Sequence, residues 1–377
     1  MGGLDRLFIV HHCLFDRHSH AYGQARGWLE ACRSRGLAPR LYVNRHAEPD
    51  IVAEFSAIPA FEYPTDIILD PDTLTRDLSD FITVAERFAA DCGALDRDGI
   101  GGSDVMFVTF SSERDILGAA LWLERLPQER RPTVAFLFLS PDFGWHIDPQ
   151  RDRVSGEFSR ARYAMRRLRG VLPVKKIVVL ATTERLASLL RTILQHPCDV
   201  CALPKYFVDA DVLAATDAQV PGRSTVFVAG EFRAEKGADL TVPVMLRLAS
   251  QRRGLSFAVQ VPDEQIAHTV REQLTPMANS GSYCRIDYGQ LSHEVYQKRL
   301  LLSDILLLPY LWWRYALRAS GVFAEAVGFG IVTVVPDRTW MSDMRAAGWG
   351  AGTVFAEPTV ENIAAAVSSA IDAYPAL

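Results

Sequence analysis

The chain of 377 residues has no apolar run long enough to cross a membrane. The longest run, "ILLLPYLWW", is interrupted by Pro309 and falls far short of the roughly 20 residues that a transmembrane helix needs. The first residues, "MGGLDRLFIVHH", contain too short an apolar stretch for a secretory signal peptide. We therefore expect a cytoplasmic protein.

The chain also has little cysteine and no excess of positive charge. Its six cysteines are scattered, which excludes a disulfide framework, and its one CxxC, Cys198 to Cys201, lacks the second ligand pair of a zinc site. The net charge of −5 gives no general attraction to nucleic acid, so we expect no such partner. No Gly-x-Gly-x-x-Gly follows a predicted strand, which disfavours a dehydrogenase. Asp-x-Asp triplets occur, but none follows a suitable strand, and we assign no metal site.

Short β-rich runs alternate with longer amphipathic runs, the pattern of parallel βαβ units. In the first half we predict strands at residues 7–13, 40–44, 105–110, 133–140, 176–181 and 198–203, and helices at 22–35, 77–92, 114–126, 159–168 and 184–195. In the second half we predict strands at 225–229, 256–260, 284–287, 305–309 and 332–335, and helices at 238–252, 263–275, 293–301, 321–328 and 359–373.

The two series are separated by the weakly apolar stretch 211–223, which ends in Pro-Gly and has the character of a linker. The sequence thus predicts an α/β protein with two tandem Rossmann-like domains, residues 1–210 and 224–377. Ligands of open α/β sheets bind beyond the carboxyl ends of the strands. We therefore expect the site in a cleft between the two domains.

A basic loop, "GEFRAEKGADL", runs from Gly230 to Leu240, between a predicted strand and a predicted helix. Free N–H groups at a helix start and the helix dipole favour an anion there. Arg233 adds a bidentate fork and Lys236 a compact charge, which suit a phosphate or diphosphate. The alternative is a solvated turn whose cations pair with neighbouring glutamates.

A second candidate is the stretch "YALRASGVFAEAVGFG", an almost wholly apolar helix with one charge, Glu325. Ser320 is a good N-cap, and Gly321 lets a ligand approach the backbone. Glu325 lies four residues after Gly321 and hence on the same helix face, where a carboxylate suits the hydroxyls of a ribose. Arg318 and the Ser-Gly amides suit phosphate. The alternative is a structural pair between Glu325 and Arg318.

Together with "DYGQLSHEVYQKRLLLSDILLLPY", these stretches resemble the nucleotide-sugar glycosyltransferases of the GT-B fold and are most similar to the large retaining family four. The resemblance implies a donor of the UDP or GDP type on the C-terminal domain, with Gly230, Arg233 and Lys236 at its diphosphate and Glu325 at its ribose. Backbone groups near Tyr288 would meet the base.

The same resemblance implies a hydroxyl acceptor on the N-terminal domain, retention of configuration, no cofactor and no essential metal. Two positions depart from the family pattern. Glu231 stands where an arginine is usual, and Leu317 stands eight residues before Glu325, where the family has its first glutamate. A non-catalytic nucleotide-sugar-binding protein and another GT-B activity, such as an epimerase, therefore stay open as alternatives to a hexosyltransferase of polysaccharide biosynthesis.

The N-terminal half offers weaker candidates. His18, His20 and Tyr22 fall between the first strand and its helix and are candidate acceptor-side contacts, while Asp142 and His146 follow another strand as candidate catalytic residues. The segment from Arg160 to Lys176 is basic and free of acids. It suits either a solvated helix face or peripheral contact with an anionic inner membrane, as for a lipid-linked acceptor.

Overall fold

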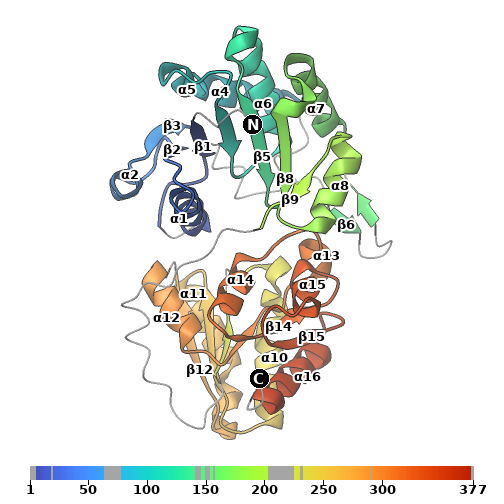
Figure 1. Cartoon of the computed structure of the whole chain (residues 1–377). Helices are drawn as coiled ribbons and strands as arrows, with labels where there is room; N and C mark the ends of the chain where they lie inside the picture. The colour runs from blue at the N-terminus through green and yellow to red at the C-terminus, as the bar shows by residue number, and fades with distance from the viewer. Residues whose placement is uncertain are drawn as a thin grey trace. The chain divides into compact units, whose positions relative to one another are not determined.

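A computed structural model describes residues 6–17, 20–62, 78–140, 146–148, 153–155, 158–202, 225–229, 232–289 and 291–374. The chain divides into two compact units, residues 1–205 and 206–377, which are described separately (Figure 1). The predicted linker, 211–223, lies outside the described residues.

The first unit contains a parallel sheet of seven strands in the order β3-β2-β1-β4-β5-β8-β9. Its strands are β1 (Leu7–His11), β2 (Arg40–Asn44), β3 (Ile58–Phe61), β4 (Val105–Val108), β5 (Thr133–Phe138), β8 (Ile177–Ala181) and β9 (Asp199–Val200), with an antiparallel pair, β6 (His146–Asp148) and β7 (Arg153–Ser155). Its helices are α1 (His20–Arg33), α2 (Pro49–Phe55), α4 (Leu78–Asp91), α5 (Gly93–Arg97), α6 (Glu113–Glu124), α7 (Ser159–Val171) and α8 (Glu184–Leu194).

The second unit contains a parallel sheet of six strands in the order β12-β11-β10-β13-β14-β15. Its strands are β10 (Thr225–Val228), β11 (Ser256–Val261), β12 (Tyr283–Tyr288), β13 (Ile305–Leu307), β14 (Val332–Pro336) and β15 (Gly352–Phe355). Its helices are α10 (Ala238–Gln251), α11 (Glu264–Gln273), α12 (His293–Leu301), α13 (Trp312–Tyr315), α14 (Gly321–Gly328), α15 (Trp340–Ala346) and α16 (Val360–Ala373).

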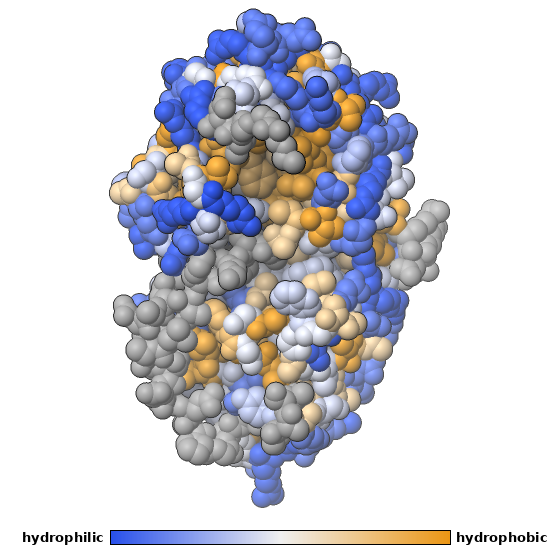
Figure 2. All heavy atoms as spheres, in the orientation of Figure 1, coloured by the Kyte–Doolittle hydropathy of each residue, from blue (hydrophilic) through white to orange (hydrophobic). Residues whose placement is uncertain are grey.

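Each face of each sheet packs against its own hydrophobic cluster, as expected for parallel strands covered by helices. Along β1, Phe8 and Val10 join the cluster under α4 to α8, while Ile9 joins the cluster under α1 and α2 (Figure 1). In the second unit, α10, α11 and α16 cover one face and α12, α14 and α15 the other. On the side that Figure 2 shows, apolar atoms also gather in the middle of the first unit, surrounded by hydrophilic ones.

Most predicted elements form, and the differences lie at their ends and at the sheet edges. The first strand ends at His11 and not at Cys13, because the N–H of Leu14 turns back to the carbonyl of His11 at 2.9 Å. Within the described part of the predicted strand 198–203, only the two residues of β9 form a strand, and Cys198 before it has its carbonyl bound by the Arg191 guanidinium at 2.8 Å. The edge strands β3 and β15 and the short helices α2, α5, α13 and α15 were not predicted.

The strand order gives each sheet a point at which the chain reverses its direction of winding. In the first unit the chain runs from β1 outward to β3, then returns to add β4 on the other side of β1. In the second it runs from β10 to β12 and returns to add β13 beside β10. Ligands of such sheets bind at the carboxyl ends of the two strands that flank this switch point. The loops after β1 and β4, and those after β10 and β13, are therefore the places to look for a site.

Candidate functional site

The predicted basic loop follows β10, at the switch point of the second unit. Gly230 and Glu231 lie outside the described residues, and Arg233 caps a short 3-10 helix that ends at Lys236. Gly237 then adopts a φ of 77°, and a Cβ there would lie 2.1 Å from the carbonyl oxygen of Pro309. Only glycine permits this approach, so the basic loop packs directly on the backbone that follows β13.

One further contact joins the basic loop to the segment after β13. The N–H of Leu311 donates to the carbonyl of Glu235 at 3.1 Å. The Glu235 carboxylate also forms an ion pair with the Arg233 guanidinium at 3.2 Å. The structural alternative considered for this loop is thus present in part, yet the Arg233 side chain is 50% exposed and can reach a further anion.

Arg318 follows α13 in that same segment and is half-buried. Its Nε is buried and has no hydrogen-bond partner among the residues that the structure describes, and its guanidinium lies over the Tyr315 ring at 5.9 Å. Burial lowers the pKa of Arg318, and the charges of Arg314, Glu235 and Arg233 are near enough to shift it as well. Because an arginine stays charged in proteins, this is a cation without a full complement of acceptors beside the basic loop.

Helix α14 begins as predicted. Ser320 is its N-cap, with Oγ accepting from the N–H of Phe323 at 3.2 Å. Val322, Phe323 and Ala326 face the hydrophobic cluster under α12 and α15. The first turn of α14 thus presents its free N–H groups close in sequence to Arg318, an arrangement that favours an anion.

Glu325 lies on the buried side of α14 and is only 5% exposed. Its Oε2 is buried and has no hydrogen-bond partner in the described part of the chain. Burial raises the pKa of Glu325 to about 7, and the Tyr296 hydroxyl of α12 offsets this in part. Oε2 can therefore accept a further hydrogen bond, which a hydroxyl group of a sugar would supply.

No ion pair joins Arg318 to Glu325, so the structural alternative proposed from the sequence does not form between these two described residues. Each keeps a buried polar atom without a partner, one a donor and one an acceptor. Buried groups of this kind are rare in native proteins because leaving one unsatisfied costs roughly 1–3 kcal/mol, and they call for a ligand or another explanation.

Tyr288 ends the edge strand β12, and its side chain is 52% exposed. The following Gly289 turns with a φ of 76° and is fixed by two bonds, from its N–H to the carbonyl of Val261 and from Nε2 of Gln260 to its own carbonyl. This segment lies two strands away from the switch point, at the same edge of the sheet as the basic loop.

The predicted acceptor-side and catalytic residues of the first unit are described only in part. His18 and Asp142 lie outside the described residues, as do the side chains of His20, which begins α1, and His146, which begins β6. Tyr22 is 5% exposed, and its hydroxyl donates to Oε1 of Glu54 at 2.8 Å. Burial and this bond raise the pKa of Tyr22 to about 12, so its hydroxyl is already engaged within the unit.

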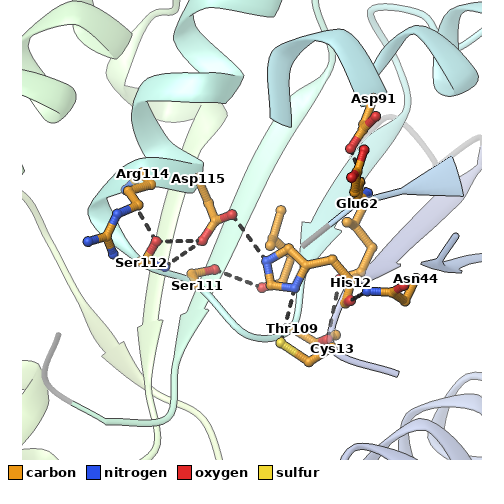
Figure 3. Close-up of polar contacts among 12 residues, drawn as sticks. His12, Cys13, Asn44, Glu62, Asp91, Thr109, Ser111, Ser112, Arg114 and Asp115 are labelled. Atoms are coloured by element: carbon orange, nitrogen blue, oxygen red, sulfur yellow. Dashed lines mark hydrogen bonds and ion pairs between the residues drawn. The ribbon is translucent and has the colours of Figure 1, made fainter. Parts of the chain in front are cut away.

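The structure instead brings three other residues together at the switch point of the first unit (Figure 3). His12 follows β1, and its Nε2 lies 3.1 Å from Oδ1 of Asp115, in the first turn of α6. Its Nδ1 lies 3.3 Å from Sγ of Cys13. The three side chains are 1%, 2% and 6% exposed. The "HHC" after the first strand and the "SSERD" after the fourth were the signals for this cluster, and its residues were not among the predicted site residues.

The two adjacent histidines have opposite charge states. Burial alone would lower the pKa of His12, but Cys13 and Asp115 raise it to about 10. His11 projects to the other face of the sheet, where burial, and then the charge of His12, lower its pKa to about 3. At neutral pH His12 is therefore a buried cation and His11 is neutral.

The basic segment from Arg160 to Lys176 forms α7 and the turn after it. Several of its cations are engaged within the unit: Arg167 pairs with Glu124 at 2.6 Å, and Lys176 donates to two backbone carbonyls at 2.8 and 2.7 Å. No helix within the described ranges is long and apolar enough to span a bilayer.

The fold and the paired units define a GT-B architecture, as solved structures bear out. The chain is similar to a UDP-forming α,α-trehalose-phosphate synthase from Burkholderia vietnamiensis (12% identity, 98% of this chain and 91% of that one, TM-score 0.61). It is also similar to a glycosyltransferase from Rickettsia africae (10%, 98% and 89%, 0.60) and to Anabaena Alr3699/HepE in complex with UDP (10%, 98% and 90%, 0.59).

At these identities the likeness establishes the fold, which confirms the predicted fold class. The chain matches no known family model and no curated protein sequence.

Proposed function

We propose that this protein is a glycosyltransferase that moves a sugar from a nucleoside-diphosphate sugar to a hydroxyl acceptor, with the donor bound by the second unit. The observation that carries the proposal is the pair of buried polar atoms without partners, Nε of Arg318 and Oε2 of Glu325. The similarity of the fold to solved glycosyltransferases supports the same assignment.

A ligand that satisfies both groups must offer an anion to the guanidinium and a hydroxyl donor to the carboxylate. A nucleoside diphosphate offers both, because its ribose hydroxyls lie beside the phosphates. Arg318 precedes the first turn of α14, and Glu325 lies one turn inside it, about 6 Å along the helix axis from Gly321. This separation suits a ribose that sits over the bare glycine while its diphosphate faces the helix start.

In this proposal the second unit stabilises the leaving group. Arg233, Lys236 and Arg318, with the N–H groups of the first turn of α14, would hold the diphosphate and offset the negative charge that grows on it during transfer. Glu325 would hold the ribose and so fix the position of the anomeric carbon. Retention of configuration and independence from metal ions are parts of the proposal that rest on the sequence resemblance.

UDP is the first nucleotide to test, because similar structures are described as UDP-forming or as complexes with UDP. We place the acceptor, a sugar or a lipid-linked sugar, at the carboxyl ends of the strands of the first unit. Peripheral membrane contact would concern α7, whose exposed cations are Arg162 and Arg166.

The test is a transfer assay with UDP-, GDP- and ADP-sugars across a set of sugar and lipid-linked acceptors. We expect one donor to release its nucleoside diphosphate only when a suitable acceptor is present. Lys236→Ala and Glu325→Ala should lower the rate at least about tenfold, the smallest loss expected when an interaction made in the transition state is removed.

Wild-type turnover in both variants, with the fold verified by circular dichroism, would contradict the assignment. Tight nucleotide binding without transfer to any acceptor would instead favour the non-catalytic alternative. The buried Leu317, at the position of the family's first glutamate, is the residue that suggests this alternative.

A further inference from the structure

We propose that Cys13 is a modification site: His12 and Asp115 activate its sulfur as a nucleophile, and hydrogen peroxide oxidises it selectively. The proposal concerns the first unit and is independent of any activity of the second. It rests on the geometry of three side chains that meet where β1 and β4 end (Figure 3).

The contacts fix which nitrogen of His12 carries the proton. Oδ2 of Asp115 accepts from the N–H and the hydroxyl of Ser112, at 2.7 and 2.8 Å, as part of the capping box of α6. Oδ1 is left to face Nε2 of His12 at 3.1 Å. Since an ionised carboxylate only accepts hydrogen bonds, Nε2 must be the donor. Nδ1 therefore faces the sulfur of Cys13 and shares a proton with it.

This order of groups activates a nucleophile. A carboxylate orients a histidine, and the histidine lies within hydrogen-bond reach of a thiol, which is how thiols are made reactive in nucleophilic sites. Asp115 raises the affinity of the imidazole for a proton, and the proton then comes from the nearest acid, the thiol of Cys13. Nδ1 lies 3.3 Å from the sulfur and is placed to take the thiol proton when the sulfur attacks.

The backbone around the thiol is fixed, so the geometry is built in. Nδ2 of Asn44 donates to the carbonyl of His12 at 3.0 Å, and the N–H of Asn44 donates to the carbonyl of Leu14 at 3.2 Å. The ring of Phe88 packs edge-on against the His12 ring, with centroids 6.0 Å apart. The groups that face His12 are thus Asp115 from α6, Cys13 from its own segment, Asn44 from β2 and the uncharged Phe88 from α4, while His11 lies on the other face of the sheet and interacts with His12 only through charge.

Burial selects the reactant. Cys13 is only 6% exposed, so a bulky electrophile reaches it poorly, while hydrogen peroxide is hardly larger than water. The thiolate attacks one peroxide oxygen, an S–O bond forms, and the O–O bond breaks. The hydroxide that leaves takes the proton from His12 and becomes water. The sulfur is oxidised to a sulfenic acid, and the peroxide is the electron acceptor.

Other cysteines of the chain are internal controls. Cys201 and Cys284 are more exposed than Cys13 but lack a histidine partner among the contacts of the described residues. Burial raises the pKa of Cys201, and it raises the pKa of Cys284 to about 12, so both are thiols at neutral pH. If exposure decided reactivity, Cys201 and Cys284 would react first. If activation by His12 decides it, Cys13 reacts first.

The test treats the full-length chain with hydrogen peroxide at pH 7, removes the peroxide with catalase, and unfolds the protein in excess N-ethylmaleimide. Mass spectrometry then gives the fraction of each cysteine that kept its thiol. We expect Cys13 to be lost at least about tenfold faster than Cys201 and Cys284, because the thiolate is the reactive species. Equal rates, or faster loss of the two exposed cysteines, would overturn the proposal.

Asp115→Asn should slow the loss of Cys13 about tenfold and leave Cys201 unchanged. Asp91→Asn is the matched control, because it removes a buried carboxylate that pairs with Arg45 and not with His12. If Asp115→Asn does not fold, the oxidation rates of the wild-type protein at different pH values still test the proposal. The rate of loss of Cys13 should exceed the rates of Cys201 and Cys284 at both pH 6 and pH 8. A Cys13 rate no faster than theirs at either pH would contradict activation by His12.

Discussion

The two switch points occupy equivalent places in similar sheets, but they differ in how His12 of the first unit and Arg318 and Glu325 of the second are partnered. In the first unit, both nitrogens of His12 are engaged, one by Asp115 and one by Cys13. In the second unit, Arg318 and Glu325 each keep a buried polar atom without a partner. The comparison teaches that topology marks a place where a site can form, and that unsatisfied polar groups indicate where a ligand is required.

The largest expected effect on stability is in the first unit. Asp115→Asn removes the partner of a buried cation, so we expect a loss of about 3 kcal/mol of stability at pH 7. The pKa of His12 is raised from 6.5 to about 10, so this contribution is fully present below pH 6.5 and disappears as the pH rises through 10. Urea unfolding of the full chain, monitored through the hydrogen exchange of amides in residues 1–205, measures this loss of stability.

The difference between wild type and Asp115→Asn should therefore shrink between pH 7 and pH 10.5. Asp91→Asn is again the control, since its effect should not follow the titration of His12. A difference that is constant with pH would show that His12 is not a buried cation.

Glu325→Gln should have the opposite effect in the second unit. The pKa of Glu325 is raised from 4.5 to about 7, so its contribution to stability is complete below pH 4.5 and is lost as the pH rises through 7. An amide of the same shape carries no charge to bury. Above pH 7 we expect the variant to be more stable by up to about 3 kcal/mol, at roughly 1.4 kcal/mol for each pH unit of the shift. Thermal unfolding at pH 5 and pH 8 measures the difference.

A gain in stability at pH 8 but not at pH 5 would mark Glu325 as a residue kept for binding at the expense of stability. A variant less stable than wild type at both pH values would mean that the carboxylate has a structural partner.

Much of the second unit followed from the sequence, because its signals are local. The Ser320 cap, the apolar period of α14 and the lone charge of Glu325 lie within six residues and predict one another. The basic loop is equally local, running from the end of β10 into α10. What the sequence did not give is the contact of Gly237 with Pro309, which joins segments about seventy residues apart and depends on strand order.

The cluster of the first unit could not be predicted in the same way. His12 and Asp115 are 103 residues apart and meet only because β4 is added beside β1. The predicted first strand also included His12 and Cys13, whereas the observed strand ends at His11. By contrast, Tyr22 was chosen for its place in a loop and is in fact packed in α1 with its hydroxyl engaged by Glu54.

Arg318→Ala should weaken the binding of a nucleotide to the second unit. Hydrogen bonds to charged groups contribute about 1.5–3 kcal/mol, so the affinity for UDP should fall about 10- to 100-fold. Arg271→Ala is the matched control, because this exposed arginine lies in the last turn of α11, toward the opposite edge of the sheet. Calorimetric titration gives both affinities, and equal affinities in the two variants would exclude Arg318 from the site.

The smallest expected effect is the pH dependence of nucleotide affinity. A ribose hydroxyl donates to the ionised carboxylate, so binding favours deprotonated Glu325 and should strengthen about tenfold from pH 6 to pH 8. The UDP affinity of Glu325→Gln should be flat over this range. The same pH slope in the variant would assign the dependence to another group.

In the proposed site, the two halves of one nucleotide satisfy the two buried groups of the second unit. The most direct measurement is calorimetric titration of wild type, Arg318→Ala and Glu325→Gln with pyrophosphate and with uridine. We predict that Arg318→Ala weakens pyrophosphate and leaves uridine unchanged, while Glu325→Gln weakens uridine and leaves pyrophosphate unchanged. If neither compound binds the wild type, or if both variants affect both compounds alike, the account of this site is wrong.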